Sequence, residues 1–219
     1  MLGATDLHAA MASLAKRRPV FHSEADFQFA LAWELRRRHP DVELRLEYPV
    51  PLKDVRGEVD IWLPEAGGAV AIELKYWTRR AELTANDEPF LLKERAFKNL
   101  YLYDFWKDVA RTESLIAQGL AQGGYVIALT NDRFYESSGK GTAAYEAFRM
   151  YEGREVPSGT LAWTGNPSRN AIRGREEPHR LRGRYFTSWQ PYPSDPADPG
   201  SNFRYLLLDV EAGIAEAKA

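Results

Sequence analysis

The chain has 219 residues, of which 44% are hydrophobic, 27% charged and 12% aromatic, as is typical of a globular protein with an ordinary core. It contains no cysteine, which excludes disulfides, thiolate metal sites and a cysteine nucleophile. The formal net charge of −2 gives nucleic-acid binding no support, so any such function must rest on local basic patches. No apolar run approaches the roughly 20 residues that span a bilayer, and the N-terminus lacks the features of a secretory signal, so we expect a cytoplasmic protein that does not enter a membrane.

The first third of the chain predicts one helix followed by strands. Apolar residues recur at helical spacing from 23 to 39, where Ser23 is a suitable N-cap and Pro40 ends the helix. Three strands are then predicted, over residues 42–50, 58–63 and 69–75. The turn-forming residues 64–68 join the second and third strands into a hairpin.

A second helix and a buried strand follow. Helical periodicity runs from about 89 to 119 and is interrupted at Gly123-Gly124. Residues 125–130 form the continuous apolar run of a strand buried on both faces, and a short helix is expected near 142–150. The order helix, three strands, helix and buried strand predicts an α/β fold with a mixed central sheet flanked by helices.

The character of the sequence changes after residue 150. Seven of the 13 prolines and six of the 16 glycines fall between 151 and 200, so long regular elements are not expected there. Two strands are predicted over 181–189 and 203–210, separated by the loop 190–202, and we expect them to form a C-terminal β-hairpin. Residues 1–150 are therefore interpreted as the core, and residues 151–219 as an irregular Arg/Pro-rich segment and hairpin packed on it, one domain overall.

Two carboxylates and one ammonium group share a face of the hairpin predicted at 58–75. Side chains alternate across a strand, so Asp60 on one strand and Glu73 and Lys75 on the next point to the same side. If Leu63 pairs with Val70 across the turn, Asp60 lies directly opposite Glu73, where like charges destabilise the pair. A Mg²⁺ or Mn²⁺ ion between the two would turn this repulsion into ligation, because hard cations take carboxylate, carbonyl and water oxygens. The alternative interpretation is a solvated hairpin face with a cross-strand ion pair.

Lys75 is expected to keep its charge beside these carboxylates, whose negative field favours the ammonium form. An ammonium group at this position is suited to orient an attacking water or to neutralise a phosphate under attack. The chemistry that this face predicts is metal-dependent hydrolysis of a phosphodiester bond.

The segments Val59-Asp60 and Ile72-Glu73-Leu74-Lys75 resemble the PD-(D/E)xK, or restriction-endonuclease-like, nuclease superfamily. The resemblance covers roughly residues 20–131 and implies an α-β-β-β-α-β core. It implies that Asp60 and Glu73 bind metal and that Lys75 is the catalytic lysine. Val59 stands where the family name has proline. Weaker similarities near 103–109, 129–132 and 203–208 point to an uncharacterised bacterial subgroup of the superfamily.

An acidic residue on the first helix is frequent in this family, and here Glu24 matches it, although a purely helix-stabilising role is an equal alternative. The sequence is therefore interpreted as a Mg²⁺-dependent nuclease, with DNA favoured over RNA as substrate. Asp60, Glu73 and the backbone carbonyl of Leu74 would hold the ion, and Mn²⁺ is expected to substitute. Many nucleases of this fold act as dimers, so a homodimer is possible. The rival interpretation is a catalytically silent module that binds nucleic acid or a protein partner.

Basic residues mark a candidate nucleic-acid surface. The richest segment is 169–184, where phosphate contact is weighed against a solvated loop; its arginines are Arg169, Arg173, Arg175, Arg180, Arg182 and Arg184. Arg79 and Arg80 directly follow the lysine-bearing strand and are placed to meet phosphate. On the long helix, Asp104, Asp108 and Arg111 share one face. Intrahelical ion pairs are the preferred interpretation of this face, and the alternative is that Asp104 or Asp108 lines the site.

Overall fold

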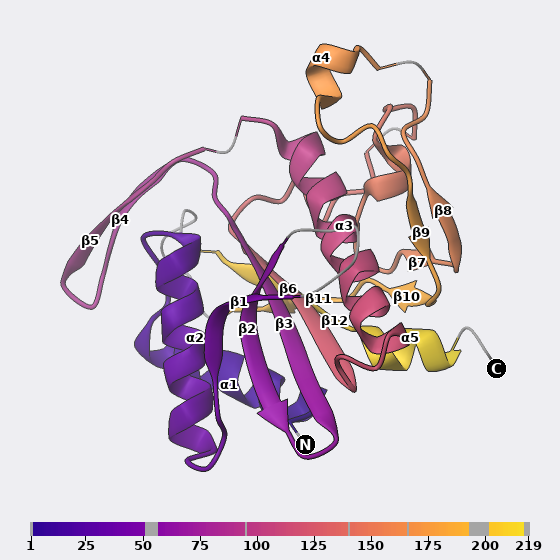
Figure 1. Ribbon diagram of the computed structural model, residues 1–219. Helices are drawn as coiled ribbons and strands as arrows, with labels where there is room; N and C mark the ends of the chain where they lie inside the picture. Colours follow the sequence, from indigo (N-terminus) through magenta and orange to yellow (C-terminus); the bar gives the residue numbers. More distant parts are fainter. Residues whose placement is uncertain are drawn as a thin grey trace.

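A six-stranded mixed sheet forms the centre of the computed structural model, and helices cover both of its faces (Figure 1). The structure describes residues 2–50, 57–94, 96–139, 141–165, 167–192 and 202–216. The strands lie in the order β1 (Arg45–Pro49), β2 (Glu58–Glu65), β3 (Gly68–Trp77), β6 (Gly123–Thr130), β12 (Arg204–Asp209) and β11 (Trp189–Pro191). Only the β3–β6 pair is parallel; the other neighbours in this sheet are antiparallel. The predicted α/β class, with a mixed central sheet flanked by helices, is confirmed.

The helices bury their apolar stripes on opposite faces of this sheet. Helices α1 (Ala4–Arg17) and α2 (Glu24–Arg38) pack on one face, with the apolar side chains that β2 and β3 direct to that side. Helices α3 (Lys98–Ala117) and α5 (Val210–Glu216) pack on the other face, against β6 and β12. No described helix has the length and hydropathy needed to cross a membrane.

The hairpin of β2 and β3 has the register expected from the sequence. Leu63 pairs with Val70, and the turn at Ala66-Gly67 places Gly67 at φ +93°, a conformation that glycine adopts without steric cost. The apolar side chains of Ile61 and Ile72 are fully buried on the α1–α2 side of the sheet. Because strand side chains alternate, the polar residues next to them are directed to the opposite side.

The helix predicted from residue 89 begins later, at Lys98, so its first nine residues were assigned wrongly. A hairpin of β4 (Ala81–Ala85) and β5 (Glu88–Leu92) stands there instead and projects beyond the sheet in Figure 1. Its turn is formed by Asn86 and Asp87, both with positive φ (51° and 64°), as a two-residue hairpin turn requires. The predicted helix began after this turn, so the turn residues Asn86-Asp87 were left unassigned.

Helix α1 was not anticipated from the sequence, although its buried residues Leu7, Ala10, Met11 and Leu14 recur at helical spacing. The short helix expected near 142–150 is reduced to a single 3₁₀ turn, η1 (Glu146–Phe148). The remaining short elements between 151 and 192 are β7 (Glu155–Val156), β8 (Gly159–Leu161), α4 (Arg169–Ile172), β9 (His179–Leu181) and β10 (Tyr185–Phe186).

The prediction of one continuous strand over 181–189 is wrong, because the backbone in this segment hydrogen-bonds to a side chain of α3. Glu113 of α3 is buried and its carboxylate accepts hydrogen bonds from the backbone N–H groups of Arg182 (2.8 Å) and Gly183 (2.7 Å) and from the hydroxyl of Tyr185 (2.7 Å). The C-terminal hairpin itself is present, since β11 pairs antiparallel with β12. Most of its predicted loop 190–202 lies outside the described residues.

Candidate active site

The ladder between β2 and β3 ends next to two carboxylates. Its last pair is Ile61 with Ile72, and the residues that follow on the two strands are Asp60 and Glu73. The Asp60 carboxylate reaches across and accepts a hydrogen bond of 2.6 Å from the backbone N–H of Leu74. Asp60 is partly buried, and Glu73 is only 1% exposed.

Helix α3 completes this group with a carboxylate and a guanidinium. Lys75 Nζ lies 2.6 Å from Asp108 Oδ2 and donates to the Leu74 carbonyl at 3.0 Å. Arg111 Nη2 lies 3.0 Å from Asp108 Oδ1 and 2.6 Å from Glu73 Oε1. An unbroken chain of charges therefore runs from Glu73 through Arg111 and Asp108 to Lys75. The intrahelical pair between Asp108 and Arg111 is present as expected, and Asp108 also lines the site, which was the alternative interpretation. The part played by Arg111 in the site was not predicted.

A glycine on β6 allows α3 to approach this closely, because a Cβ atom on Gly124 would collide with Thr112 of α3. Gly57, directly before β2, lies beside the guanidinium end of the Arg111 side chain. The interruption at Gly123-Gly124, interpreted only as a helix break, is thus also the point where the helix rests on the sheet.

The first residue of α2 reaches the same place from the other side. Ser23 caps the helix by accepting a hydrogen bond from the Asp26 N–H (3.1 Å), as expected. The carboxylate of Glu24 accepts a hydrogen bond of 2.7 Å from the N–H of Tyr76 on β3. A cleft of about 340 Å³ results, lined by Glu24, Lys75, Trp77, Tyr101, Asp104, Lys107, Asp108 and Arg111.

The buried charges of this site are not balanced. Four carboxylates (Glu24, Asp60, Glu73 and Asp108) meet two cations, Lys75 and Arg111. Burial raises the pKa of Asp60 to about 6, although Lys75 opposes the shift. Burial, aided by Asp108, raises the pKa of Glu73 to about 8, and Arg111 opposes that shift. Burial would lower the pKa of Lys75, but the carboxylates around it, Asp108 foremost, raise it above its ordinary value. When all four carboxylates are ionised the site is an electronegative pocket that an added cation would stabilise, and burial raises the pKa values of Asp60 and Glu73 against that state.

The possible ligands for such a cation are few. Within the described residues, no group of three or more His, Asp or Glu side chains is arranged to hold a metal ion. Comparison of the chain with protein-family models, curated proteins and solved structures finds no match. The donors at hand are the carboxylates of Asp60 and Glu73 with the Leu74 carbonyl, and Mg²⁺ usually takes only one or two carboxylates and keeps several waters. Glu73 Oε1 is buried and accepts no hydrogen bond from a described residue, although Arg111 forms an ion pair with it. This donor set and the excess negative charge fit a hard divalent cation.

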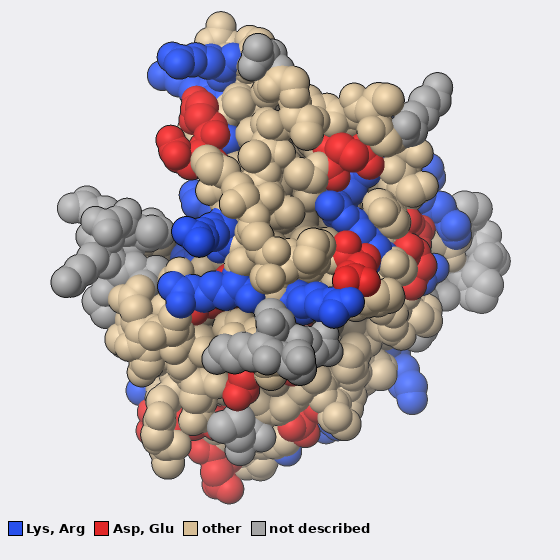
Figure 2. All heavy atoms as spheres, turned by 90° about the vertical axis from the view of Figure 1, so that its right-hand side faces the viewer, with Lys and Arg blue, Asp and Glu red and all other residues tan. Residues whose placement is uncertain are grey.

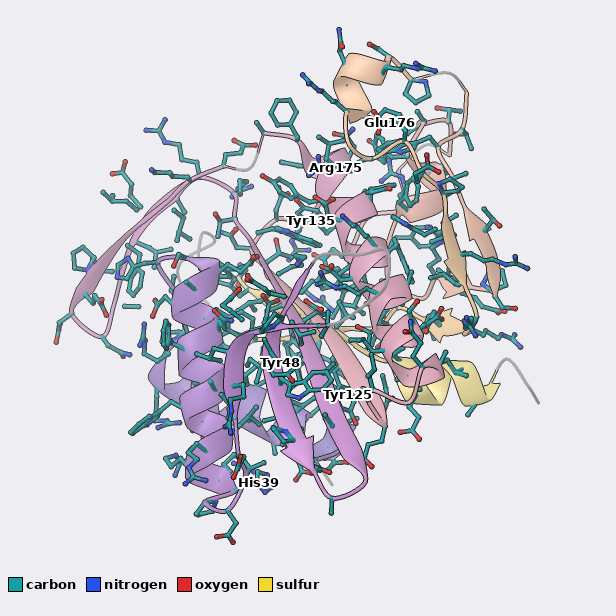
Figure 3. The ribbon with its side chains drawn as sticks, viewed as in Figure 1. His39, Tyr48, Tyr125, Tyr135, Arg175 and Glu176 are labelled. Carbon is teal, nitrogen blue, oxygen red and sulfur yellow. The ribbon has the colours of Figure 1, made fainter. Side chains whose placement is uncertain are left out.

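The arginines of segment 169–184 do not form one patch. Arg175, labelled in Figure 3, makes a two-pronged ion pair with Asp104 of α3 (2.8 and 2.7 Å), and Asp104 lines the cleft. Arg184 pairs with Glu155 at 2.6 Å. Arg182 lies next to Glu113, nine residues beyond Asp104 on α3 and so about 13 Å further along the helix.

Four arginines of that segment are exposed and make no ion pair with any residue whose placement is described: Arg169, Arg173, Arg180 and Arg182. In Figure 2, basic side chains gather at the level of α4, with acidic ones below them and further basic ones lower on the same face. Arg79 and Arg80 are exposed beyond β3, and Arg80 lies 4.0 Å from Glu82, but neither lines the cleft.

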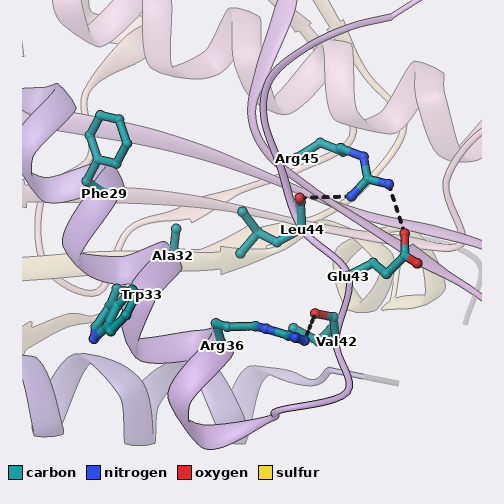
Figure 4. Close-up of a pocket in the computed structure, with 8 residues that line it drawn as sticks. All are labelled: Phe29, Ala32, Trp33, Arg36, Val42, Glu43, Leu44 and Arg45. Atoms are coloured by element: carbon teal, nitrogen blue, oxygen red, sulfur yellow. Dashed lines mark hydrogen bonds and ion pairs between the residues drawn. The ribbon is translucent and has the colours of Figure 1, made fainter.

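A second hollow, of about 410 Å³, lies between α2 and the segment that leads into β1 (Figure 4). The exposed rings of Phe29 and Trp33 border it. Its charged groups are already engaged, since Arg45 pairs with Glu43 (2.9 Å) and Arg36 donates to the Val42 carbonyl (2.6 Å). It shares no residue with the cleft and contains none of the groups described above.

Proposed function

We propose that this chain is a metal-dependent nuclease that hydrolyses phosphodiester bonds, with DNA favoured over RNA. The observation that carries the proposal is the grouping of Asp60, Glu73 and Lys75 on one face of neighbouring strands, beside a solvent-accessible cleft that Lys75 lines. The order of α2, three strands, α3 and β6 supports the resemblance to the PD-(D/E)xK superfamily, with β4–β5 as an insertion. A stable core has no need of such an electronegative cluster, which costs free energy unless a ligand compensates it.

Asp60, Glu73 and the Leu74 carbonyl are the residues that would hold Mg²⁺ or Mn²⁺. When bound, such an ion polarises a phosphoryl oxygen and makes a water more acidic. Lys75 is held by Asp108 and by the Leu74 carbonyl, so its ammonium is fixed next to the carboxylates and can neutralise charge that develops on the phosphate. Glu24, fixed by the Tyr76 N–H, is placed to orient the attacking water or to accept its proton.

A second function is supported by a specific feature. The ion pairs from Glu73 through Arg111 and Asp108 to Lys75 partly neutralise the site without any metal, as a catalytically silent nucleic-acid or protein-binding module would require. A metal that binds only the folded state stabilises it in proportion to the logarithm of metal concentration. A melting temperature that rises with Mg²⁺ or Mn²⁺ therefore favours the nuclease, and one that does not change favours the silent module.

The direct test is an assay of the purified protein on single-stranded, duplex and branched DNA and on RNA, each with Mg²⁺, Mn²⁺ or EDTA. We expect cleavage of at least one DNA substrate with either metal and none with EDTA. Absence of cleavage on all substrates with both metals would contradict the nuclease assignment and leave the binding module.

The exposed arginines of segment 169–184 are expected to contribute to DNA binding according to whether an acid already pairs with them. Arg182→Ala should weaken binding and reduce the slope of log K against log salt by about 0.9, the value for one lost phosphate contact. Arg184→Ala is the matched control. Arg184 lies two residues after Arg182 but already pairs with Glu155, so its loss should change the slope less. Filter binding or fluorescence anisotropy at several salt concentrations measures both. Equal slopes for the wild type and both variants would remove this segment from the DNA-binding surface.

A further inference from the structure

One cation that lines the cleft has no ion-pair partner among the residues that the structure describes. The lining includes three cations, Lys75, Lys107 and Arg111, and three carboxylates. Lys75 and Arg111 both pair with Asp108. Lys107 is exposed and makes no ion pair or hydrogen bond with any residue in the part of the chain that the structure describes.

The carboxylate on α3 that would be expected to pair with Lys107 is already paired with another residue. Asp104 lies three residues before Lys107 on α3, a spacing at which oppositely charged side chains commonly pair. Arg175 occupies both oxygens of Asp104, however, with hydrogen bonds of 2.8 and 2.7 Å. A planar guanidinium matches a carboxylate in this two-pronged way better than an ammonium group does, so Arg175 competes successfully for Asp104.

We propose that Lys107 forms an anion subsite for a backbone phosphate of the substrate strand, adjacent to the phosphate that is cleaved. The subsite rests on the proposed function, because it supplies that reaction with a binding contact. Lys107 lies on the cleft wall one helical turn before Arg111, so a phosphate bound there is beside the buried charges and not among them. An exposed ammonium loses little hydration when it meets a phosphate, and it carries no competing acid.

The basic residues near Lys107 indicate which way the substrate's nucleic-acid strand leaves the cleft. Arg175 ties the α4 segment to Asp104, next to Lys107 on the same helix. Arg169 and Arg173 lie beyond it and are exposed without ion pairs to described residues. Basic side chains without described ion-pair partners therefore stand at Lys107 and again at α4, with the acidic Glu176 and Glu177 shortly after α4 in the chain, and we place the strand that leaves the cleft along this side.

The test measures binding separately from cleavage. Lys107→Ala is introduced into a Lys75→Met background, and the affinity for a short DNA oligonucleotide is followed by anisotropy with Mg²⁺ at several salt concentrations. We expect affinity to fall about threefold to tenfold and the salt slope to fall by about one, as for one lost phosphate contact. Lys107→Arg should restore both. Lys16→Ala on α1, which removes an equal charge on the other face of the sheet, is the control and should change neither.

In the otherwise unmodified chain, Lys107→Ala should raise KM for the oligonucleotide by a similar factor and leave kcat nearly unchanged, because the contact is made equally in the ground and transition states. An unchanged affinity and salt slope would overturn the subsite even if the chain cleaves DNA. Lack of cleavage together with a Lys107-dependent affinity would instead retain the subsite and overturn the nuclease. Protection from thermal unfolding by inorganic phosphate that Lys107→Ala abolishes would identify a free-phosphate pocket, and would contradict a strand subsite.

Discussion

Replacing Lys75 with methionine is expected to reduce Mg²⁺-dependent DNA cleavage by about 10²- to 10³-fold, the usual loss when one preorganised group that stabilises transition-state charge is removed. Methionine keeps the length of the side chain and removes only the ammonium. Asp108, the ion-pair partner of Lys75, retains Arg111 at 3.0 Å, so it is not left as an isolated buried charge. The fold should therefore persist. Initial cleavage rates and circular dichroism spectra of the two proteins measure the two effects.

A matched control is available at the start of α3, the helix that carries Asp108. Lys98 also forms a 2.6 Å ion pair with a buried aspartate, Asp132, and its side chain is 23% exposed against 17% for Lys75. Lys98 does not line the cleft. Lys98→Met should thus cost stability without a specific loss of cleavage. If Lys75→Met retains full activity, or if both variants lose activity in parallel with stability, the catalytic role of Lys75 is wrong.

The part of the site that lies on one hairpin could be predicted from the sequence. Alternation of apolar and polar residues fixes which side chains share a face, and matching the apolar faces fixes the register of the hairpin to within steps of two residues. The pairing of Leu63 with Val70 across the turn then makes Asp60 and Glu73 the residues that follow the last pair of the ladder. Local periodicity is sufficient here because the two strands are adjacent in the chain.

The contribution of α3 could not be predicted in the same way. The spacing of Asp108 and Arg111 indicates only that they share a helical face, and it does not say what that face covers. The answer depends on Gly124 and Thr112, whose close approach sets the helix against β6. Arg175, 71 residues from Asp104 in the chain, then pairs with Asp104 and keeps this carboxylate from Lys107. Such pairings between distant segments leave no periodic signal in a single sequence.

The two wrongly predicted segments have identifiable physical causes. The Asn86-Asp87 turn competes with helical periodicity in the neighbouring residues, and it prevails because Leu83, Phe90 and Leu92 bury their side chains against the α1–α2 side of the core. Between 181 and 189, the pattern of alternation is correct, but Glu113 binds the backbone of Arg182 and Gly183 and takes it out of the sheet. Tertiary contacts override local preference in both places.

Asp60→Asn is expected to stabilise the metal-free protein at pH 8 by about 2 kcal/mol while abolishing its response to Mg²⁺. Burial raises the pKa of Asp60 from an ordinary 3.8 to about 6, so the folded state binds this proton more tightly than the unfolded state does. The free energy of unfolding of the wild type should therefore decrease as pH rises from about 4 to about 6, by up to about 3 kcal/mol at 1.36 kcal/mol per pKa unit. Asparagine removes the charge and can still accept the Leu74 N–H hydrogen bond through its amide oxygen, although more weakly.

Urea unfolding in EDTA at pH 4.5, 6 and 8 tests this, because the stability of the Asn variant should change less between these pH values than that of the wild type. Mg²⁺ added at pH 8 should stabilise only the wild type, since metal binding to the folded state alone adds to its stability. Asp104→Asn is the contrasting control: Asp104 is compensated by Arg175, so neutralising it should destabilise the protein. If Asp60→Asn lowers stability at pH 8 as Asp104→Asn does, the Asp60 carboxylate is a structural group whose charge the fold requires. That result would contradict the proposal that this site attracts a cation.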